Sequence, residues 1–311
     1  MDISHTKAIN RNDKKRREKV NGNNMSLFMI SRFAYFKPHN LNEAVQYLEK
    51  EEKSFVLAGG TDLMILLRRN LINAEHIVDI KALPETADFS FIDGAGLTIG
   101  ASVVVNRVVD SEIVKAKYPA LNEAAASLAS FQLRNRATVV GNICNASPGA
   151  DLPPALLVYD AIVTISGPQG TRQVPLHEFF TGVKRTVLQR GELVVSVQLP
   201  EPGEGDKSIY IRQARLRGHD LATVGVASRI KPDGKVAIGI CAVAPTPKRL
   251  FALEDQINER GLSQETIAWA AEAIREHIRP ITDVRSSAQY RLQMASVLLK
   301  RGLLTLIGKE A

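Results

Sequence analysis

The sequence has 311 residues, of which 45% are apolar and 23% charged, proportions typical of a globular protein with two or three domains. No apolar run approaches the roughly 18 residues of a membrane span, and no apolar segment near the start is long enough for a secretory signal. The formal net charge of +7 includes +4 from residues 1–25, where seven Lys and Arg stand against three acidic residues, so the remainder of the chain does not indicate a nucleic-acid-binding domain.

Residues 1–25 are polar and contain no aromatic side chain, a composition typical of disorder. We therefore expect an unstructured basic tail, with a basic docking arm as the alternative. The two cysteines, Cys144 and Cys241, cannot by themselves hold an iron–sulfur cluster or a structural zinc ion, and they fit a reducing, cytoplasmic setting. The six histidines lack metal-binding spacing, so no metal site is predicted.

The first elements form a small α/β unit. Residues 41–52 place apolar side chains on one helical face, with Asn40 or Asn42 available as the N-cap. A strand at 54–58, a glycine turn and a short helix at about 62–69 follow. Further short strands are predicted at 76–80 and 97–103.

The middle of the chain combines helices with a hairpin. Residues 106–130 read as helical in two pieces that are separated near Pro119. The stretch LRNRATVVGNICNASPGADLPP, residues 133–154, fits no regular periodicity, and we expect an irregular functional segment there. A hairpin at 161–166 and 171–176 and a strand at 192–200 come next. The composition of EPGEGDK then indicates a linker and a domain boundary near residue 203.

The last third of the sequence predicts an antiparallel sheet with helices. Three strands are expected within 208–216, 220–230 and 236–244, the last two joined by the turn at 232–235. Two helices, at about 264–278 and 287–304, would cover the sheet, because each element then has an apolar face to bury. We expect their apolar stripe to belong to the core, with a partner-subunit interface as the alternative.

Two glycine-containing turns are candidates for a binding site. LAGGTD, residues 57–62, joins a strand to a helix without a Cβ at Gly59 or Gly60, so its N–H groups can cradle a phosphate. A plain strand-to-helix turn would explain the same glycines, and neither the P-loop nor the Rossmann pattern is present. The second turn, ATVVGNICNASPGAD at 137–151, offers small residues among Asn, Ser and Asp. Two such segments could clasp a dinucleotide from both sides.

These two segments carry a family resemblance. LAGGTDL, followed about eighty residues later by LRNRATVVGNICNASPGADLPPALLVYDA, resembles the FAD-binding subunits of molybdenum hydroxylases, the group containing xanthine dehydrogenase and carbon monoxide dehydrogenase. The similarity extends from about Phe33 to the C-terminus. It implies an α+β fold with an FAD-binding domain at 26–203, made of subdomains at about 26–85 and 86–203. A C-terminal flavoprotein domain with a three-stranded antiparallel sheet and helices would occupy 204–311.

The resemblance also implies the residues of the FAD site, whose pyrophosphate would be held by the first turn. On that turn they are Leu57, Ala58, Gly59, Gly60, Thr61, Asp62 and Leu63. Around the second turn they are Ala129, Leu133, Ala137, Thr138, Val140, Gly141, Asn142, Cys144, Asn145 and Asp151, with Val194 and Arg212 further along.

Several of these residues have competing interpretations. Val140 stands where the family has the first glycine of its ATxGGN pattern. Arg212 stands where the family often has Lys, near the flavin ring, and a solvated strand residue is the alternative. Cys144 is expected to be a small packing residue, with a nucleophile as the alternative. Arg134 and Arg136 are candidates for a phosphate or partner contact, with solvation as the alternative.

The function implied by the resemblance is electron transfer within a complex. A molybdopterin-binding subunit would oxidise the substrate, a [2Fe–2S] subunit would pass electrons on, and the FAD on this chain would deliver them to NAD or another acceptor. Two cysteines cannot supply the extra [4Fe–4S] cluster of some relatives, which favours the xanthine dehydrogenase-like type. No nucleic acid or membrane is expected as a partner. The alternatives are a stand-alone FAD-dependent oxidase of a small molecule and a non-enzymatic binding module that uses the basic tail.

Overall fold

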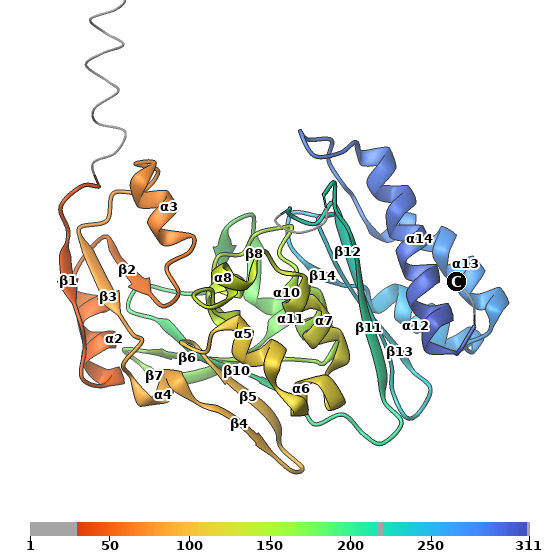
Figure 1. Ribbon diagram of the computed structural model, residues 1–311, viewed down its shortest axis with the longest axis horizontal. Coiled ribbons are helices and arrows are strands. Elements are labelled where there is room, and N and C mark those ends of the chain that lie inside the picture. The colour runs from red at the N-terminus through yellow and green to blue at the C-terminus, as the bar shows by residue number, and fades with distance from the viewer. Residues whose placement is uncertain (1–29, 217–219, 310–311) are drawn as a thin grey trace, which may run out of the picture.

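The computed structural model describes residues 30–216 and 220–309, which form three larger sheets side by side, a two-stranded hairpin sheet, and helices between and around them (Figure 1). The predicted basic tail, residues 1–25, lies outside the described residues. Within the described residues, no helix is both long and apolar enough to cross a membrane.

The first sheet is small and parallel, in the order β1-β3-β2. Its strands are β1 (Ala34–Phe36), β2 (Ser54–Leu57) and β3 (His76–Asp79), and its helices are α2 (Leu41–Lys50) and α3 (Leu63–Arg68). The predicted cap of the first helix is confirmed at Asn40, whose side chain accepts a hydrogen bond from the Glu43 amide. The glycine turn follows the carboxyl end of β2 and leads into α3.

The second sheet is antiparallel, with five strands in the order β4-β5-β10-β6-β7. The strands are β4 (Phe89–Ile92), β5 (Gly96–Gly100), β6 (Ile162–Gly167), β7 (Gly170–Pro175) and β10 (Leu193–Leu199). β6 and β7 confirm the predicted hairpin. The strand predicted at 97–103 is β5, which ends at Gly100 and pairs with β4 and β10, so its expected place in the small α/β unit is wrong.

Short helices connect the strands of this sheet, and some of them lie between it and the C-terminal sheet. They are α4 (Pro84–Ala87), α5 (Val105–Asp110), α6 (Glu112–Lys117), α7 (Pro119–Ser127), α8 (Phe131–Arg134), α9 (Val139–Cys144), α10 (Leu152–Val158) and α11 (Leu176–Phe179). The hairpin of β8 (Phe180–Gly182) and β9 (Arg185–Thr186) follows. The region predicted as two helices at 106–130 contains three, because Ser111 caps α6 and Pro119 begins α7.

The expected irregular segment at 133–154 is also partly helical. Thr138 caps α9 by accepting from the Gly141 amide, and every residue of α10 is buried. These helices were missed because α9 has six residues and α10 seven, too few to display an amphipathic period, and α10 is apolar on all sides.

The third sheet forms the C-terminal part, in the order β11-β12-β13-β14. Its strands are β11 (Lys207–Gln213), β12 (Val224–Ile230), β13 (Val236–Cys241) and β14 (Lys248–Arg249), and its helices are α12 (Phe251–Arg260), α13 (Gln264–His277) and α14 (Ala288–Leu306). The three long antiparallel strands and the last two helices were predicted. The two-residue β14 and helix α12 were not.

This sheet lies between two layers of helices, as Figure 1 shows. One face packs Val226, Ile238 and Ile240 against the C-terminal helices. The other face carries small residues, and a Cβ on Gly239 would stand 2.3 Å from the carbonyl oxygen of Pro154 in α10. Because this face belongs to the same core as the second sheet, the C-terminal part is joined to the rest by buried apolar contacts.

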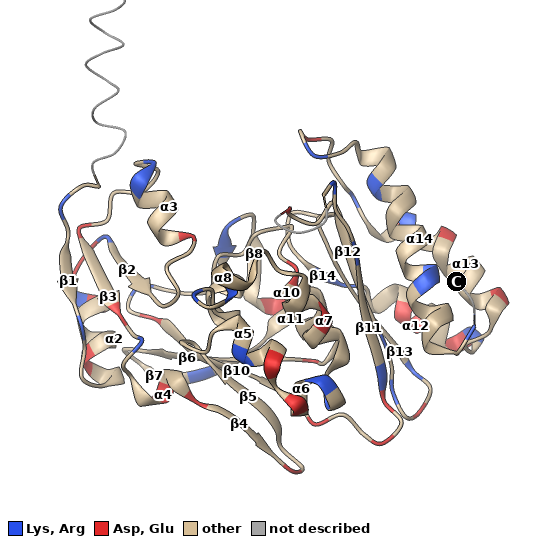
Figure 2. Cartoon of the chain, viewed as in Figure 1, with Lys and Arg blue, Asp and Glu red and all other residues tan. Residues whose placement is uncertain are grey.

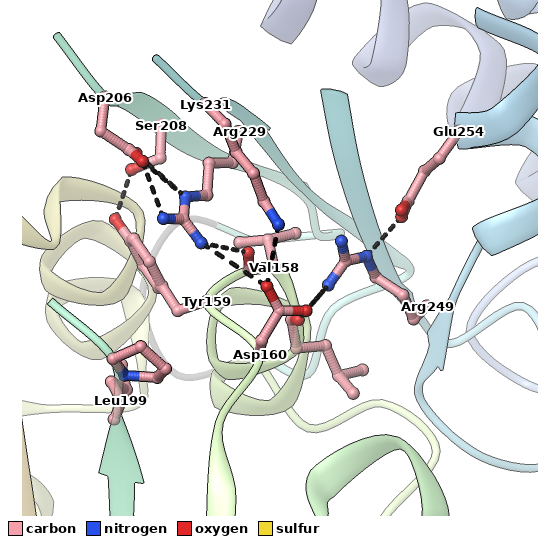
Figure 3. Close-up of polar contacts among 12 residues, drawn as sticks. Val158, Tyr159, Asp160, Leu199, Asp206, Ser208, Arg229, Lys231, Arg249 and Glu254 are labelled. Carbon is pink, nitrogen blue, oxygen red and sulfur yellow. Dashed lines mark hydrogen bonds and ion pairs between the residues drawn. The ribbon is translucent and has the colours of Figure 1, made fainter. Parts of the chain in front are cut away.

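A polar network reinforces that junction (Figure 3). Asp160, which follows α10, pairs with Arg249 at 2.8 Å and Lys231 at 3.1 Å. Arg249 also donates to the Leu157 carbonyl at 2.6 Å and forms an ion pair with Glu254, a residue only 4% exposed. Nearby, Arg229 is similarly buried against Asp206, at 2.7 Å. Several charges are therefore paired at the boundary between the two parts.

A further buried arginine fixes the start of α14. Arg291 is 1% exposed and donates to the carbonyls of Thr223 and Ala242, both at 2.8 Å, and to Asp283 at 2.7 Å. Asp283 also accepts from Arg285 at 2.7 Å. Partial burial alone would raise the pKa of Asp283, but these arginines outweigh it and hold the pKa well below its usual range.

Candidate functional site

The two glycine-containing turns meet in space. Gly59 lies so close to the second segment that a Cβ there would stand 2.1 Å from the Arg136 carbonyl oxygen and 3.0 Å from the Ala137 Cα. Gly60 has a φ of 75°, in the left-handed region that favours glycine. The first glycine therefore permits a backbone contact, and the second permits the bend itself.

A cavity of about 660 Å³ opens beside this contact. All of the predicted site residues except Leu57 and Arg212 line it. They are Ala58, Gly59, Gly60, Thr61, Asp62, Leu63, Ala129, Leu133, Ala137, Thr138, Val140, Gly141, Asn142, Cys144, Asn145, Asp151 and Val194. Leu57 instead packs into the small apolar cluster of the first sheet.

The first turn presents unused donors to this cavity. Within residues 30–216 and 220–309, the N–H groups of Gly59, Gly60, Thr61, Asp62 and Leu63 have no acceptor, and α3 begins only with the bond from the Met64 amide to the Gly60 carbonyl. Those at the start of α3 are the N–H groups that any helix N-terminus leaves without an intrahelical partner, and none of these residues is fully buried, so a ligand can reach them. Their alignment along one wall is suited to the oxygen atoms of an anionic ligand.

The second turn contributes an unused acceptor. Asn142 Oδ1 is buried and has no hydrogen-bond partner among the described residues. Val140, where the family has glycine, lies within α9 and so adopts a conformation that valine accepts without strain. Cys144 also lines the cavity, but burial raises the pKa of its thiol to about 12, which fits the packing role expected for it and not a nucleophile.

A polar bridge crosses from one turn to the other. Asn145 donates through Nδ2 to Asp62 Oδ1 at 2.8 Å and accepts through Oδ1 from the ammonium of Lys184 at 2.7 Å. Lys184 lies in the β8–β9 hairpin and lines the cavity. Lys184 was not predicted from the sequence, since a lone lysine in TGVKRT belongs to no recognisable pattern.

The far wall of the cavity contains Asp151, which is 4% exposed. Arg212 Nη1 lies 3.3 Å from both oxygens of this carboxylate, and the Tyr210 hydroxyl donates to Oδ1 at 2.8 Å. Burial raises the pKa of Asp151, although Arg212 opposes the shift. The Arg212 side chain is 12% exposed, so its interpretation as a solvated strand residue is wrong.

Other cavity residues were also missed or left without a role. Phe55 and Val56 come from β2, Leu188 follows β9, and Asp220 and Leu221 come from the segment before β12. Apolar side chains in strands give no sequence signal that separates a cavity wall from a core.

The guanidinium group of Arg134, a candidate phosphate contact, is hydrogen-bonded within the protein. It donates to Asn106 Oδ1 and to the carbonyls of Ala126 and Leu128. Within the part of the chain that the structure describes, no group of three His, Cys, Asp or Glu residues is arranged to hold a metal ion.

Comparisons with known proteins agree with this geometry. Residues 31–202 match the family model described as the FAD binding domain in molybdopterin dehydrogenase, and residues 209–306 match the CO dehydrogenase flavoprotein C-terminal domain. The carbon monoxide dehydrogenase medium chain of Hydrogenophaga pseudoflava is 33% identical over 88% of this chain and 96% of its own length. The xanthine dehydrogenase FAD-binding subunit of Escherichia coli O157:H7 is 31% identical over 86% of this chain and 94% of its own length.

A solved structure extends the similarity to three dimensions. It is titled as a carbon monoxide dehydrogenase from Hydrogenophaga pseudoflava that lacks the Mo-pyranopterin moiety of the molybdenum cofactor. The matching chain superposes with a TM-score of 0.86 at 32% identity, covering 91% of this chain and 100% of that one.

Proposed function

The chain belongs to the family of FAD-binding subunits of molybdopterin dehydrogenases and is an oxidoreductase component, and from this premise we propose that it relays electrons through FAD bound in the cavity between its two turns. In this proposal a [2Fe–2S] subunit delivers the electrons, and NAD or another acceptor removes them. A molybdopterin-binding subunit completes the complex and oxidises the substrate.

The observation that carries the placement of FAD is the meeting of the two turns at Gly59 and Arg136. The space beside them is bounded on one side by unused N–H donors and on another by the unpaired Asn142 Oδ1. Apolar side chains such as Leu133 and Val194 line much of the remainder. Donors for a diphosphate, an acceptor for a ligand N–H or O–H, and apolar walls for a ring system are the groups that a flavin dinucleotide requires.

The chain's own residues hold and orient the cofactor. The amides from Gly59 to Leu63 donate to the diphosphate, and Asn142 accepts from the ligand. When bound, FAD supplies the ability to take up electrons one at a time and to release two together. The lining residues exclude water from that chemistry, and Val194 contributes beside the bulge that interrupts β10.

Arg212 influences the flavin ring indirectly, through Asp151. Its guanidinium is held by Asp151, which faces the cavity, and it donates to the Asp220 carbonyl at 3.0 Å. The positive charge of Arg212 therefore offsets the Asp151 carboxylate as well as any negative charge that develops on the ring.

The proposal includes the domain division expected from the sequence. FAD binds the domain at 26–203, between subdomains that divide near residue 85, and the domain at 204–311 contributes the wall around Asp220 and Leu221. The separate sheets and the limits of the two matching family models support this division. We place the chain in the cytoplasm because its two cysteines are both free.

Purification of the chain with its partners tests the function. We expect one FAD per chain, released as yellow supernatant by acid precipitation, because burial raises the pKa of the Cys144 thiol and so disfavours a covalent link to the flavin. In the complex the flavin should be reduced when the substrate of the molybdopterin subunit is added. A colourless protein that still associates with those partners would contradict the proposal, and so would substrate turnover by the isolated chain.

A further inference from the structure

Lys184 is placed in the cavity by its backbone as well as by its side chain. It adopts a φ of 58° in the turn between β8 and β9, and its amide donates to the Ala146 carbonyl at 3.0 Å. The hairpin is thereby tied to the second turn, and the Lys184 side chain lines the cavity. Figure 2 shows this hairpin, at the β8 label, as a basic element in the middle of the molecule.

The position of the ammonium group is set by Asn145. The Asn145 side chain donates through Nδ2 to Asp62 and accepts through Oδ1 from Lys184. The positive charge is therefore directed toward the first turn, where the N–H groups from Gly59 to Leu63 lack acceptors among the described residues.

No carboxylate pairs directly with the charge of Lys184 in the described part of the chain, and the hydrogen bond of its ammonium group goes to a neutral amide. Desolvation lowers the pKa of Lys184, and the nearby Asp62 partly opposes that shift. Lys184 is an exposed residue that lines the cavity, so a ligand anion can pair with its ammonium group.

Asp62 explains why an anionic ligand would require this charge. Its carboxylate sits at the start of α3, beside the amides that would bind the anion. A diphosphate at those amides would be repelled by Asp62 unless a cation were near. Lys184 is such a cation, because the Asn145 side chain hydrogen-bonds to both Asp62 and Lys184.

We propose that Lys184 supplies the positive charge that offsets the diphosphate of the bound flavin dinucleotide. This inference rests on the proposed function, because it assumes that FAD occupies the cavity. Lys184 then accounts for part of the affinity for FAD through its charge, while the flavin ring lies elsewhere along the cavity.

Lys184→Met removes the charge while retaining a long, unbranched side chain at this left-handed position. Lys184→Arg retains the charge. Arg185→Met is the matched control, because it removes one positive charge from the same hairpin at a residue that does not line the cavity. The affinity of each apoprotein for FAD is measured by quenching of flavin fluorescence, at low and high salt, and thermal unfolding checks that each variant is folded.

We expect Lys184→Met to weaken FAD binding about tenfold or more at low salt, and by less at high salt, because screening reduces the contribution of a charge. Lys184→Arg should stay within about threefold of the original protein, and Arg185→Met should match it. The reduction potential of the bound flavin should be the same in Lys184→Met as in the original protein, because the charge acts at the diphosphate.

Three results would overturn the assignment: unchanged affinity in folded Lys184→Met, equal weakening in Lys184→Met and Lys184→Arg, or a changed flavin potential with unchanged affinity. If the original apoprotein bound no FAD at all, the proposed function would fail together with this inference. If it bound FAD and Lys184→Met bound it equally well, only the role of Lys184 would fail.

Discussion

Gly59 touches the backbone of Arg136: a Cβ on Gly59 would lie 2.1 Å from the Arg136 carbonyl oxygen, although 77 positions separate the two residues in the sequence. The neighbour is main chain, which cannot rotate out of the way as a flexible side chain can. One absent methyl group thus allows the two segments to approach and to line one cavity together.

Gly59→Ala should therefore weaken FAD binding by about tenfold or more and destabilise the fold by about 1–3 kcal/mol, as expected when an added carbon must displace backbone. Flavin content after purification and thermal unfolding measure the two effects. Gly182→Ala is the control, because a Cβ there would meet nothing closer than 3.9 Å. Equal flavin content in Gly59→Ala and Gly182→Ala would show that the contact does not shape the site.

Gly60→Val should abolish FAD retention. Gly60 has a φ of 75°, which valine adopts only with strain, so the turn would change course and move its amides. Gly60→Asn is the informative comparison, since asparagine enters the left-handed region more readily and should retain more flavin. Absorbance of the purified proteins measures retention, and unchanged flavin in Gly60→Val would refute the role of the first turn.

Arg249→Met should destabilise the protein by about 3–5 kcal/mol. The Arg249 side chain is 5% exposed, and its replacement leaves the buried Glu254 carboxylate without its ion-pair partner. The substitution also removes one of the cations that pair with Asp160. Lys235→Met removes an exposed ion pair with Asp233 and should cost less than about 1 kcal/mol. Chemical denaturation of both variants compares the two losses, and similar values would mean that the buried network adds no stability.

Asp283 predicts a pH dependence. Because its pKa is well below the ordinary value in the folded state, the carboxylate contributes stability that is complete above the unfolded value of about 4. That contribution is lost as the pH falls from about 4 toward the lower pKa of the folded protein. The difference in stability between the original protein and Asp283→Asn should therefore be largest near neutral pH and shrink below pH of about 4. Thermal unfolding across this range tests it, and a constant difference would contradict it.

Local signals made part of this structure predictable. The helix capped by Asn40 and the hairpin that turns between Gly167 and Gly170 could both be predicted, because each depends mainly on residues close together in the sequence. The glycine turns were also readable, because missing side chains mark places where a backbone bends or approaches another group. The fold class followed from the family resemblance, which joined these local features into one architecture.

Other features depended on long-range contacts that no local pattern records. Helix α9 contains only Val139–Cys144, and its cap at Thr138 lies in a stretch that reads as loop. Lys184 became interpretable only when Asn145 and Asp62 were found beside it. Likewise, the sequence placed Arg212 near the cavity, but only the structure revealed that Asp151 lies between them.

The ion pairs around Asp160 bear on the rate of the proposed electron transfer. Lys231 and Arg249 reach this carboxylate from the C-terminal sheet, so the wall that carries Leu221 cannot drift away from the glycine turns without separating several charges together. Tunnelling between redox centres slows steeply as their separation grows. For the proposed electron relay, a frame that keeps such gaps constant would favour a uniform rate of transfer.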